Sequence, residues 1–226
     1  MKLDILHWNV RKNDMNAAQT LQGTEEYDIV ALQEVRIGSQ GSPSCPTMGR
    51  YRLVWSGEKV DGKPSRAAIY VNKKHLHAAW SMEAGMNWAK VTFGAGEEAI
   101  TIWSVYSPHP TEGGVWNSPL QMMVAQECYG KHIVVGDLNI HHPLWDAEGR
   151  TSGNAETLVQ LAINWNLELL TPFGEPIRRG NERERDGTLD LAWVTAGIHA
   201  TYLGPVDYAG SDYVAQWIKV DDVPAL

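Results

Sequence analysis

A short apolar run that ends on a glycine and two polar residues constrains the fold of this chain more than any other feature. Residues 132–135 are followed by Gly136, Asp137, Leu138 and Asn139. The run has the length and composition of a buried strand. Because side chains alternate with a period of two along a strand, Asp137 and Asn139 are expected on one side, at the rim of a sheet. A carboxylate and an amide placed there could hold a metal-bound phosphate or orient an attacking water. An Asx turn that merely ends the strand is the alternative.

The rest of the chain alternates short apolar runs with loops rich in glycine and proline and with a few helical windows. We expect helices at 15–21, 119–128 and 154–165, with Ser118 as a candidate N-cap of the second. No composition break marks a linker, so residues 1–226 are expected to form one α/β domain. Besides 132–135, the expected strands are 3–9, 28–34, 52–55, 67–71, 88–93, 99–106, 189–194 and 217–220.

Composition and charge narrow the range of functions. Hydrophobic residues make up 43% of the chain and charged residues 20%, which is typical of a globular protein. No apolar run has the length of a membrane span, and the N-terminus lacks the pattern of a signal peptide. We therefore expect an intracellular protein, cytoplasmic or nuclear, without membrane contact. The net charge of −8 argues against an extensive basic face of the kind that grips duplex DNA. Residues 178–186 alternate basic and acidic side chains and are expected to form a solvated loop.

Polar residues at several other strand ends suit the same chemistry. Metal-assisted phosphodiester hydrolysis needs hard oxygen ligands for Mg²⁺ and groups that orient water and phosphate. Glu34 suits the first role, and Asp137 and Asn139 suit the second. The further residues at or near strand ends are Asn9, Tyr106, the pair Thr188 and Asp190, which alternation places on one face, and Asp212 in the final loop.

Together these residues resemble the endonuclease/exonuclease/phosphatase superfamily, which includes apurinic endonucleases and DNase I-like enzymes. Within it, the chain is most similar to the endonuclease domain of non-LTR (LINE-type) retrotransposons, especially fungal ones. The resemblance covers nearly the whole chain, and it implies a four-layer α/β sandwich of two mixed β-sheets packed face to face with helices outside. The matching strings are LHWNV (6–10), DIVALQE (28–34), VYSPHP (105–110), HIVVGDLNIHHPLW (132–145), LLTPFGEPIRRG (169–180), DGTLDLAWVT (186–195) and GSD (210–212).

The resemblance also implies a role for each matching residue. Asn9 and Glu34 would hold Mg²⁺ or Mn²⁺, with Glu34 as the principal ligand. Tyr106 would contact the scissile phosphate. Asp137 would polarise or deprotonate the attacking water or act on the leaving oxygen, and Asn139 would orient the phosphate. The implied substrate is DNA or another phosphodiester.

The remaining residues of the site follow the family pattern except for one. Thr188 would bond to the phosphate, Asp190 would support the site, and Asp212 would orient the residue that follows it. In the family that residue is a catalytic histidine, whereas in this chain it is Tyr213. A tyrosine with an ordinary pKa of about 10 is neutral at pH 7 and adds no positive charge. Because such groups contribute roughly 10²–10⁴-fold, we expect impaired or altered hydrolysis.

Three histidines, His109, His141 and His142, lie in loops near the same rim and are candidates to substitute for the missing one. For His141 and His142 we expect a role in loop structure instead, because the pair belongs to the family string. Family members precede a reverse transcriptase in a longer polyprotein, so this chain is expected to be either a part of such a protein or a free-standing, domesticated descendant.

Three functions therefore remain open at the level of sequence. The first is a Mg²⁺-dependent phosphodiesterase or DNA-nicking endonuclease. The second is a repurposed enzyme that acts on a small molecule without a metal, by proton transfer or cyclisation. The third is a non-catalytic nucleic-acid-binding module.

Overall fold

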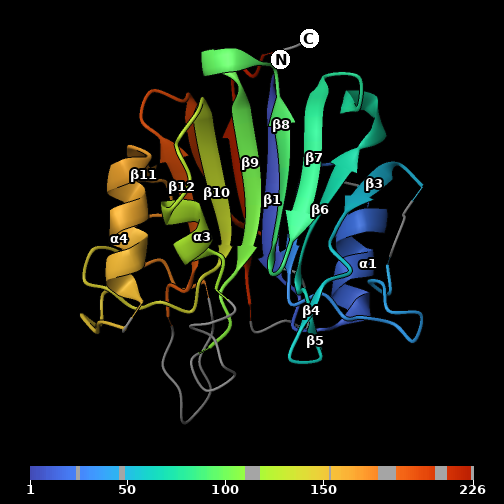
Figure 1. Cartoon of the computed structure of the whole chain (residues 1–226), viewed down its shortest axis with the longest axis horizontal. Coiled ribbons are helices and arrows are strands. Elements are labelled where there is room, and N and C mark those ends of the chain that lie inside the picture. Colours follow the sequence, from blue (N-terminus) through green and yellow to red (C-terminus); the bar gives the residue numbers. More distant parts are fainter. Residues whose placement is uncertain are drawn as a thin grey trace.

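The computed structural model of the chain describes residues 1–23, 26–45, 49–109, 118–152, 154–177, 187–206 and 213–224. In this part of the chain, two six-stranded mixed sheets pack face to face, and helices cover their outer faces (Figure 1). The four-layer α/β sandwich expected from the resemblance is confirmed.

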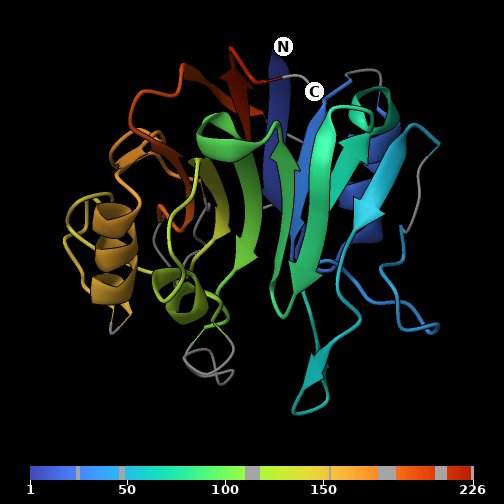
Figure 2. The same ribbon diagram turned by 45° about the horizontal axis from the view of Figure 1, so that its top comes forward.

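Both sheets bring together strands that are distant in sequence. In spatial order, the first sheet contains β13 (Ala200–Val206), β14 (Ala215–Val220), β1 (Leu3–Asn9), β2 (Ile29–Gln33), β6 (Ala67–Asn72) and β3 (Tyr51–Val54). The second contains β11 (Leu167–Leu169), β12 (Asp190–Thr195), β10 (Lys131–Asp137), β9 (Ile100–Tyr106), β8 (Trp88–Phe93) and β7 (Ala79–Gly85). A separate hairpin consists of β4 (Lys59–Val60) and β5 (Lys63–Pro64), and Figure 2 shows it extending away from the sheets.

The helices lie on both sides of the sandwich. α1 (Asp14–Gln22) covers the first sheet and is capped by Asn13, whose side chain accepts a bond from Met15 N at 2.9 Å. α3 (Leu120–Val124) and α4 (Ala155–Asn164) cover the second sheet. The helix predicted at 119–128 thus ends four residues early, because the chain must turn there toward β10. In the described residues, no helix is long and apolar enough to cross a membrane.

Strand direction brings the predicted site residues to one end of the sandwich. β1 runs parallel to β2, and β9 runs parallel to β10. The last residues of β1 and β10, Asn9 and Asp137, are hydrogen-bonded across the two sheets. The ends of these four strands therefore meet at the lower edge in Figure 1, while both chain ends lie at the upper edge. Val223 N donates to Met1 O at 2.8 Å near that upper edge.

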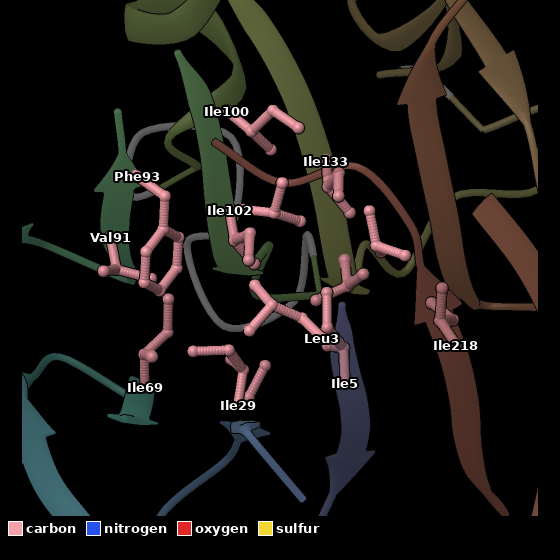
Figure 3. Close-up of a cluster of buried hydrophobic side chains, with 14 of the residues drawn as sticks. Leu3, Ile5, Ile29, Ile69, Val91, Phe93, Ile100, Ile102, Ile133 and Ile218 are labelled. Carbon is pink, nitrogen blue, oxygen red and sulfur yellow. The ribbon is translucent and has the colours of Figure 1, made fainter. Parts of the chain in front are cut away.

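A hydrophobic cluster fills the space between the sheets. Figure 3 shows branched aliphatic side chains from both sheets facing one another, with Phe93 at one side of the cluster. In β1, Leu3 and Ile5 point into this core, while Leu6 and Trp8 point outward into a second cluster under α1. Alternation therefore directs Asn9 inward, at the end of the same row. A third cluster under α3 and α4 is rich in tryptophan and contains Trp88, Trp103, Trp145, Trp165 and Trp193.

Candidate active site

The pairing of neighbouring strands places the predicted site residues at the same height along the strands. In the first sheet Asn9 is opposite Gln33, and in the second sheet Asp137 lies between Tyr106 and Asp190. Neighbours in register share a face of a sheet, and on these strands that face is the inner one. Five segments that are distant in sequence therefore present polar groups to the same end of the interface between the sheets.

The Asn9 side chain joins the two sheets. It is fully buried, and its amide nitrogen donates to Glu34 Oε1 at 3.0 Å and to Asp137 Oδ2 at 2.6 Å. Its amide oxygen accepts a bond from Arg11 N at 2.9 Å. One amide thus holds two carboxylates on either side of it, which fixes their separation and their orientation.

Glu34 reaches this cluster because the backbone departs from strand geometry. Gln33 already faces inward, so simple alternation would turn Glu34 away from the site. Its φ of +49° is in the left-handed region and brings the side chain back to Asn9. Arg11, Lys12 and Asn139 also have positive φ, at +47°, +59° and +50°. Left-handed residues other than glycine are strained by about 1–3 kcal/mol each and gather at functional sites.

Asp137 and Asn139 form both an Asx turn and part of the site. Asp137 Oδ1 accepts from Asn139 N at 3.1 Å, while its other oxygen faces Asn9. The Asn139 side chain donates to Ser107 O at 2.9 Å and so holds the end of β9. The preceding Gly136 is required by packing, because a Cβ at this position would lie 1.8 Å from Val105 O.

Tyr106 lies beside an arginine that sequence reasoning missed. Its hydroxyl accepts a bond from Arg66 Nη1 at 3.4 Å, and Arg66 Cζ lies 5.8 Å from the centre of its ring. Arg66 N donates to Asn87 Oδ1 at 3.0 Å, and Tyr106 N donates to Asn87 O at 2.9 Å. A shallow pocket lies next to them, lined by Lys63, Pro64, Arg66, Met86, Asn87, Tyr106 and Pro108. The only sequence signal for Arg66 is its place immediately before the apolar run of β6.

Thr188 and Asp190 both lie at the expected rim of the sheet, but their surroundings differ from each other. Asp190 is buried, and it is paired in register with Asp137. The Thr188 hydroxyl donates to Glu175 O at 2.7 Å, so its one proton is directed to a loop. Leu138 N donates to Leu189 O at 3.1 Å and ties the two strand ends together.

A buried polar layer lies between the sheets, next to the site. Gln33 Nε2 donates to Ser104 Oγ at 3.0 Å, and Thr171 Oγ1 donates to Gln216 Oε1, also at 3.0 Å. His7 lies in the same layer, opposite Gln216, and burial lowers its pKa from 6.5 to about 4. Sequence reasoning assigned no role to any of these residues, although His7, Gln33 and Thr171 lie within the strings that carry the family resemblance.

Tyr213 lies on the outer side of the first sheet, and Asp212 is outside the described residues. The Tyr213 ring belongs to the cluster that contains Trp8 and Val10, and only 7% of its surface is exposed. Its carbonyl accepts a bond from Trp8 Nε1 at 3.0 Å. The Arg11 guanidinium carbon lies 5.7 Å from the centre of its ring.

The candidate histidines have distinct environments. His141 Nδ1 is paired with the buried carboxylate of Asp146. Its backbone N–H donates to Ser152 Oγ at 2.8 Å, which braces the loop after Asn139. His142 lies against the Trp145 ring with centroids 4.9 Å apart, and His109 is exposed.

The donor set at Asn9 suits a hard divalent cation. Among the described residues, there is no group of three or more His, Cys, Asp or Glu side chains that could hold a metal. Mg²⁺, however, is usually held by one or two carboxylates together with waters and substrate phosphate. Glu34 provides a carboxylate of that kind, and the side-chain oxygen of Asn9 is a second oxygen donor beside it. The Lys12 ammonium lies 3.9 Å from Glu34 Oε2 and adds a positive charge at the edge of this donor set.

The fold and this convergence of strand ends define the class of protein as the endonuclease/exonuclease/phosphatase superfamily, with its DNase I-like fold. A family model described as endonuclease-reverse transcriptase matches residues 100–215, which is more than half of the chain. The chain therefore belongs to this endonuclease-reverse transcriptase family. A search of curated proteins finds no match.

Solved structures with a similar fold cover nearly the whole chain. The endonuclease domain of TRAS1, a telomere-specific non-LTR retrotransposon, has a TM-score of 0.68 at 17% identity, over 97% of this chain and 98% of that one. The Xenopus laevis APE2 catalytic domain also has a TM-score of 0.68, at 15% identity over 96% and 91%. The 3′ phosphatase NExo from Neisseria, bound to a product DNA hairpin, has a TM-score of 0.62 at 16% identity over 97% and 98%. At these identities the likeness concerns the fold.

Proposed function

We propose that this chain is a divalent-metal-dependent phosphodiester hydrolase that nicks DNA. The observation that carries the proposal is the Asn9 amide, which holds the carboxylates of Glu34 and Asp137 from opposite sheets at 3.0 and 2.6 Å. The fold neighbours support a nucleic-acid substrate, since they include a retrotransposon endonuclease domain and a phosphatase bound to product DNA.

Each residue of the cluster has a distinct task in this proposal. Glu34 and Asn9 would hold the cation, which when bound would supply positive charge to the phosphate and to the leaving oxygen. Asp137 takes the proton of the attacking water, because its carboxylate is kept in place by two hydrogen bonds. Asn139 and Tyr106 position the phosphate, and Arg66 orients the Tyr106 hydroxyl.

The tyrosine at position 213 lowers the rate in this proposal. A neutral phenol cannot carry out both the proton transfer and the charge stabilisation that a histidine offers, and groups of this kind contribute roughly 10²–10⁴-fold. The Tyr213 ring packs among apolar side chains on the outer side of the first sheet, which supports a structural use of this residue.

Nicking of supercoiled plasmid in the presence of Mg²⁺ or Mn²⁺ tests the proposal. We expect slow conversion to open circles by the wild type, and loss of conversion with EDTA, with Glu34→Gln and with Asp137→Asn. Glu127→Gln, which neutralises an exposed carboxylate, is the matched control and should nick at the wild-type rate. Equal activity of wild type and Glu34→Gln would contradict the proposal.

Two other outcomes of this experiment correspond to the alternatives. DNA binding without cleavage, weakening steeply with salt, would indicate a binding module. Turnover of a small molecule that survives EDTA would indicate a repurposed enzyme. The cross-sheet carboxylate pair favours hydrolysis over both.

A further inference from the structure

The β4–β5 hairpin is fastened to the turn between β7 and β8. Ser65, buried at the foot of the hairpin, accepts a bond from Asn87 N at 2.9 Å and donates to Gly85 O at 3.2 Å. At the tip, Asp61 and Gly62 both have positive φ, the geometry that two-residue hairpin turns prefer. The hairpin therefore projects from a fixed position beside the second sheet (Figure 2).

A pocket of about 380 Å³ lies between this hairpin, the β7–β8 turn and the segment that leads into α3. This volume is within the range of small-ligand sites, roughly 300–1,000 Å³. The apolar part of the lining of this hairpin pocket consists mainly of Val60, Met86, Trp88 and Met122. Each of these four side chains is at least partly exposed, so each has surface that a ligand can cover.

The hairpin pocket adjoins the candidate site on its tyrosine side. Met86 also lines the shallow pocket beside Tyr106. The next residue, Asn87, accepts a bond from Tyr106 N at 2.9 Å through its backbone oxygen, and Tyr106 is in register with Asp137. Because β8 and β12 lie on opposite sides of the β9–β10 pair, the hairpin pocket is on the side of the site away from Asp190. A strand with a phosphate at Tyr106 would bring an adjoining nucleotide to it.

The polar groups of the hairpin pocket favour a base over a phosphate. Among the described side chains that line it, Glu58 alone is charged, and a carboxylate repels a phosphate. A Cβ at Gly85 would lie 2.6 Å from Trp88 Nε1, so the N–H edge of the indole is at the pocket wall. In the described part of the chain this N–H has no hydrogen-bond acceptor. A nucleobase offers apolar faces, an amino group for the carboxylate and an acceptor for the indole.

We propose that the hairpin pocket binds an unpaired nucleobase next to the scissile phosphate and prefers a base with an exocyclic amino group. This inference rests on the proposed function and extends it to a class of substrate, DNA in which a base beside the nick is unpaired. A base in a duplex must first be unstacked, and this cost is least where the base is already unpaired. Such contacts need no basic face, in agreement with the net charge of −8.

Binding in the presence of EDTA tests the inference apart from cleavage. Fluorescence anisotropy compares the affinity of the full chain for a duplex with one unpaired adenine and for the same duplex fully paired. We expect about 10-fold tighter binding of the first, the effect of packing one base against aromatic and apolar side chains. Met86→Ala should lower this ratio severalfold. Met15→Ala, which changes an exposed methionine of α1, is the matched control and should keep the wild-type ratio.

The identity of the unpaired base tests the role of Glu58. The wild type should bind a duplex with an unpaired adenine or cytosine about 10-fold more tightly than one with an unpaired thymine, which has no amino group to donate to the carboxylate. Glu58→Gln should lose most of this preference. Asp61→Asn removes a carboxylate from the same hairpin outside the pocket lining and should keep it.

Several outcomes decide between this inference and its alternatives. Equal wild-type affinity for the bulged and the paired duplex would overturn it. An unchanged ratio in Met86→Ala would also overturn it, and is the result expected if the pocket receives an apolar side chain of a partner protein. A preference for the bulged duplex without any nicking would support the inference and reject the proposed hydrolysis. Nicking without that preference would overturn the inference and leave the proposed function in place.

Discussion

His7 makes the stability of the sandwich depend on pH, because it is buried between the sheets in its neutral form. Burial lowers its pKa from 6.5 to about 4, while in the unfolded chain the pKa stays near 6.5. Between these two values the unfolded chain binds a proton that the folded chain does not. The contribution of His7 is therefore complete above pH 6.5, is lost as the pH falls from 6.5 to 4, and changes no further below 4. A shift of this size corresponds to roughly 3 kcal/mol.

Urea unfolding of wild type and His7→Gln at several values between about pH 7.5 and 4.5 measures this contribution. Acidic groups titrate in both proteins, so the difference between the two curves isolates the histidine. We expect the wild-type free energy of unfolding to fall more steeply, by up to about 1.4 kcal/mol per pH unit. His199→Gln, which changes an exposed histidine, should keep the wild-type slope. Equal slopes for wild type and His7→Gln would refute the reasoning.

Three further predictions concern packing and charge. Gly136→Ala should lower the free energy of unfolding by several kcal/mol, because the alanine Cβ would lie 1.8 Å from Val105 O. Urea unfolding measures this loss, and unchanged stability would show that β9 and β10 can separate at this position. Lys12→Gln should tighten Mg²⁺ binding by a few-fold at most in calorimetric titration, because an exposed ammonium beside Glu34 is removed, and weaker binding would contradict this. Ile102→Ala should lower the free energy of unfolding by about 2–5 kcal/mol, since this side chain is fully buried in the core between the sheets; a loss below about 1 kcal/mol would show that the core closes around the gap.

The interior of both sheets could be predicted from sequence, but several of their edges could not. The strands β1, β2, β9, β10, β12 and β14 are flanked on both sides, and the sequence predicts each within a few residues from its apolar run. Within the two six-stranded sheets the missed strands are β7, β11 and β13, and all three lie at sheet edges; the short strands β4 and β5 of the separate hairpin were also missed. An edge strand has one partner and exposed alternate positions, as in β13, so its apolar signal is weak. Gly204 and Pro205 within β13 add a turn signal that hides it further.

The site was predictable where it depends on strand ends and not where it depends on loops. The sequence predicted that Asn9, Glu34 and Asp137 lie at strand ends near a common rim, and the structure places Asn9 and Asp137 next to Glu34. The left-handed turn that directs Glu34 inward is set by tertiary contacts and has no sequence signature. The approach of Arg11 to Tyr213 likewise joins segments from the two ends of the chain.

The sandwich is held together differently at its two ends. Away from the candidate site the sheets meet through aliphatic side chains, which stabilise in proportion to the area they bury, at roughly 25 cal/mol per Å². Near the rim they meet through amides and hydroxyls such as those of Gln33 and Ser104, and each such bond contributes only about 0.5–1.5 kcal/mol net. Backbone amides at the rim should therefore exchange with solvent through small openings, while those at the aliphatic end require global unfolding. The end of the sandwich that carries the candidate site should therefore open locally at a lower free energy than the end that carries the chain termini.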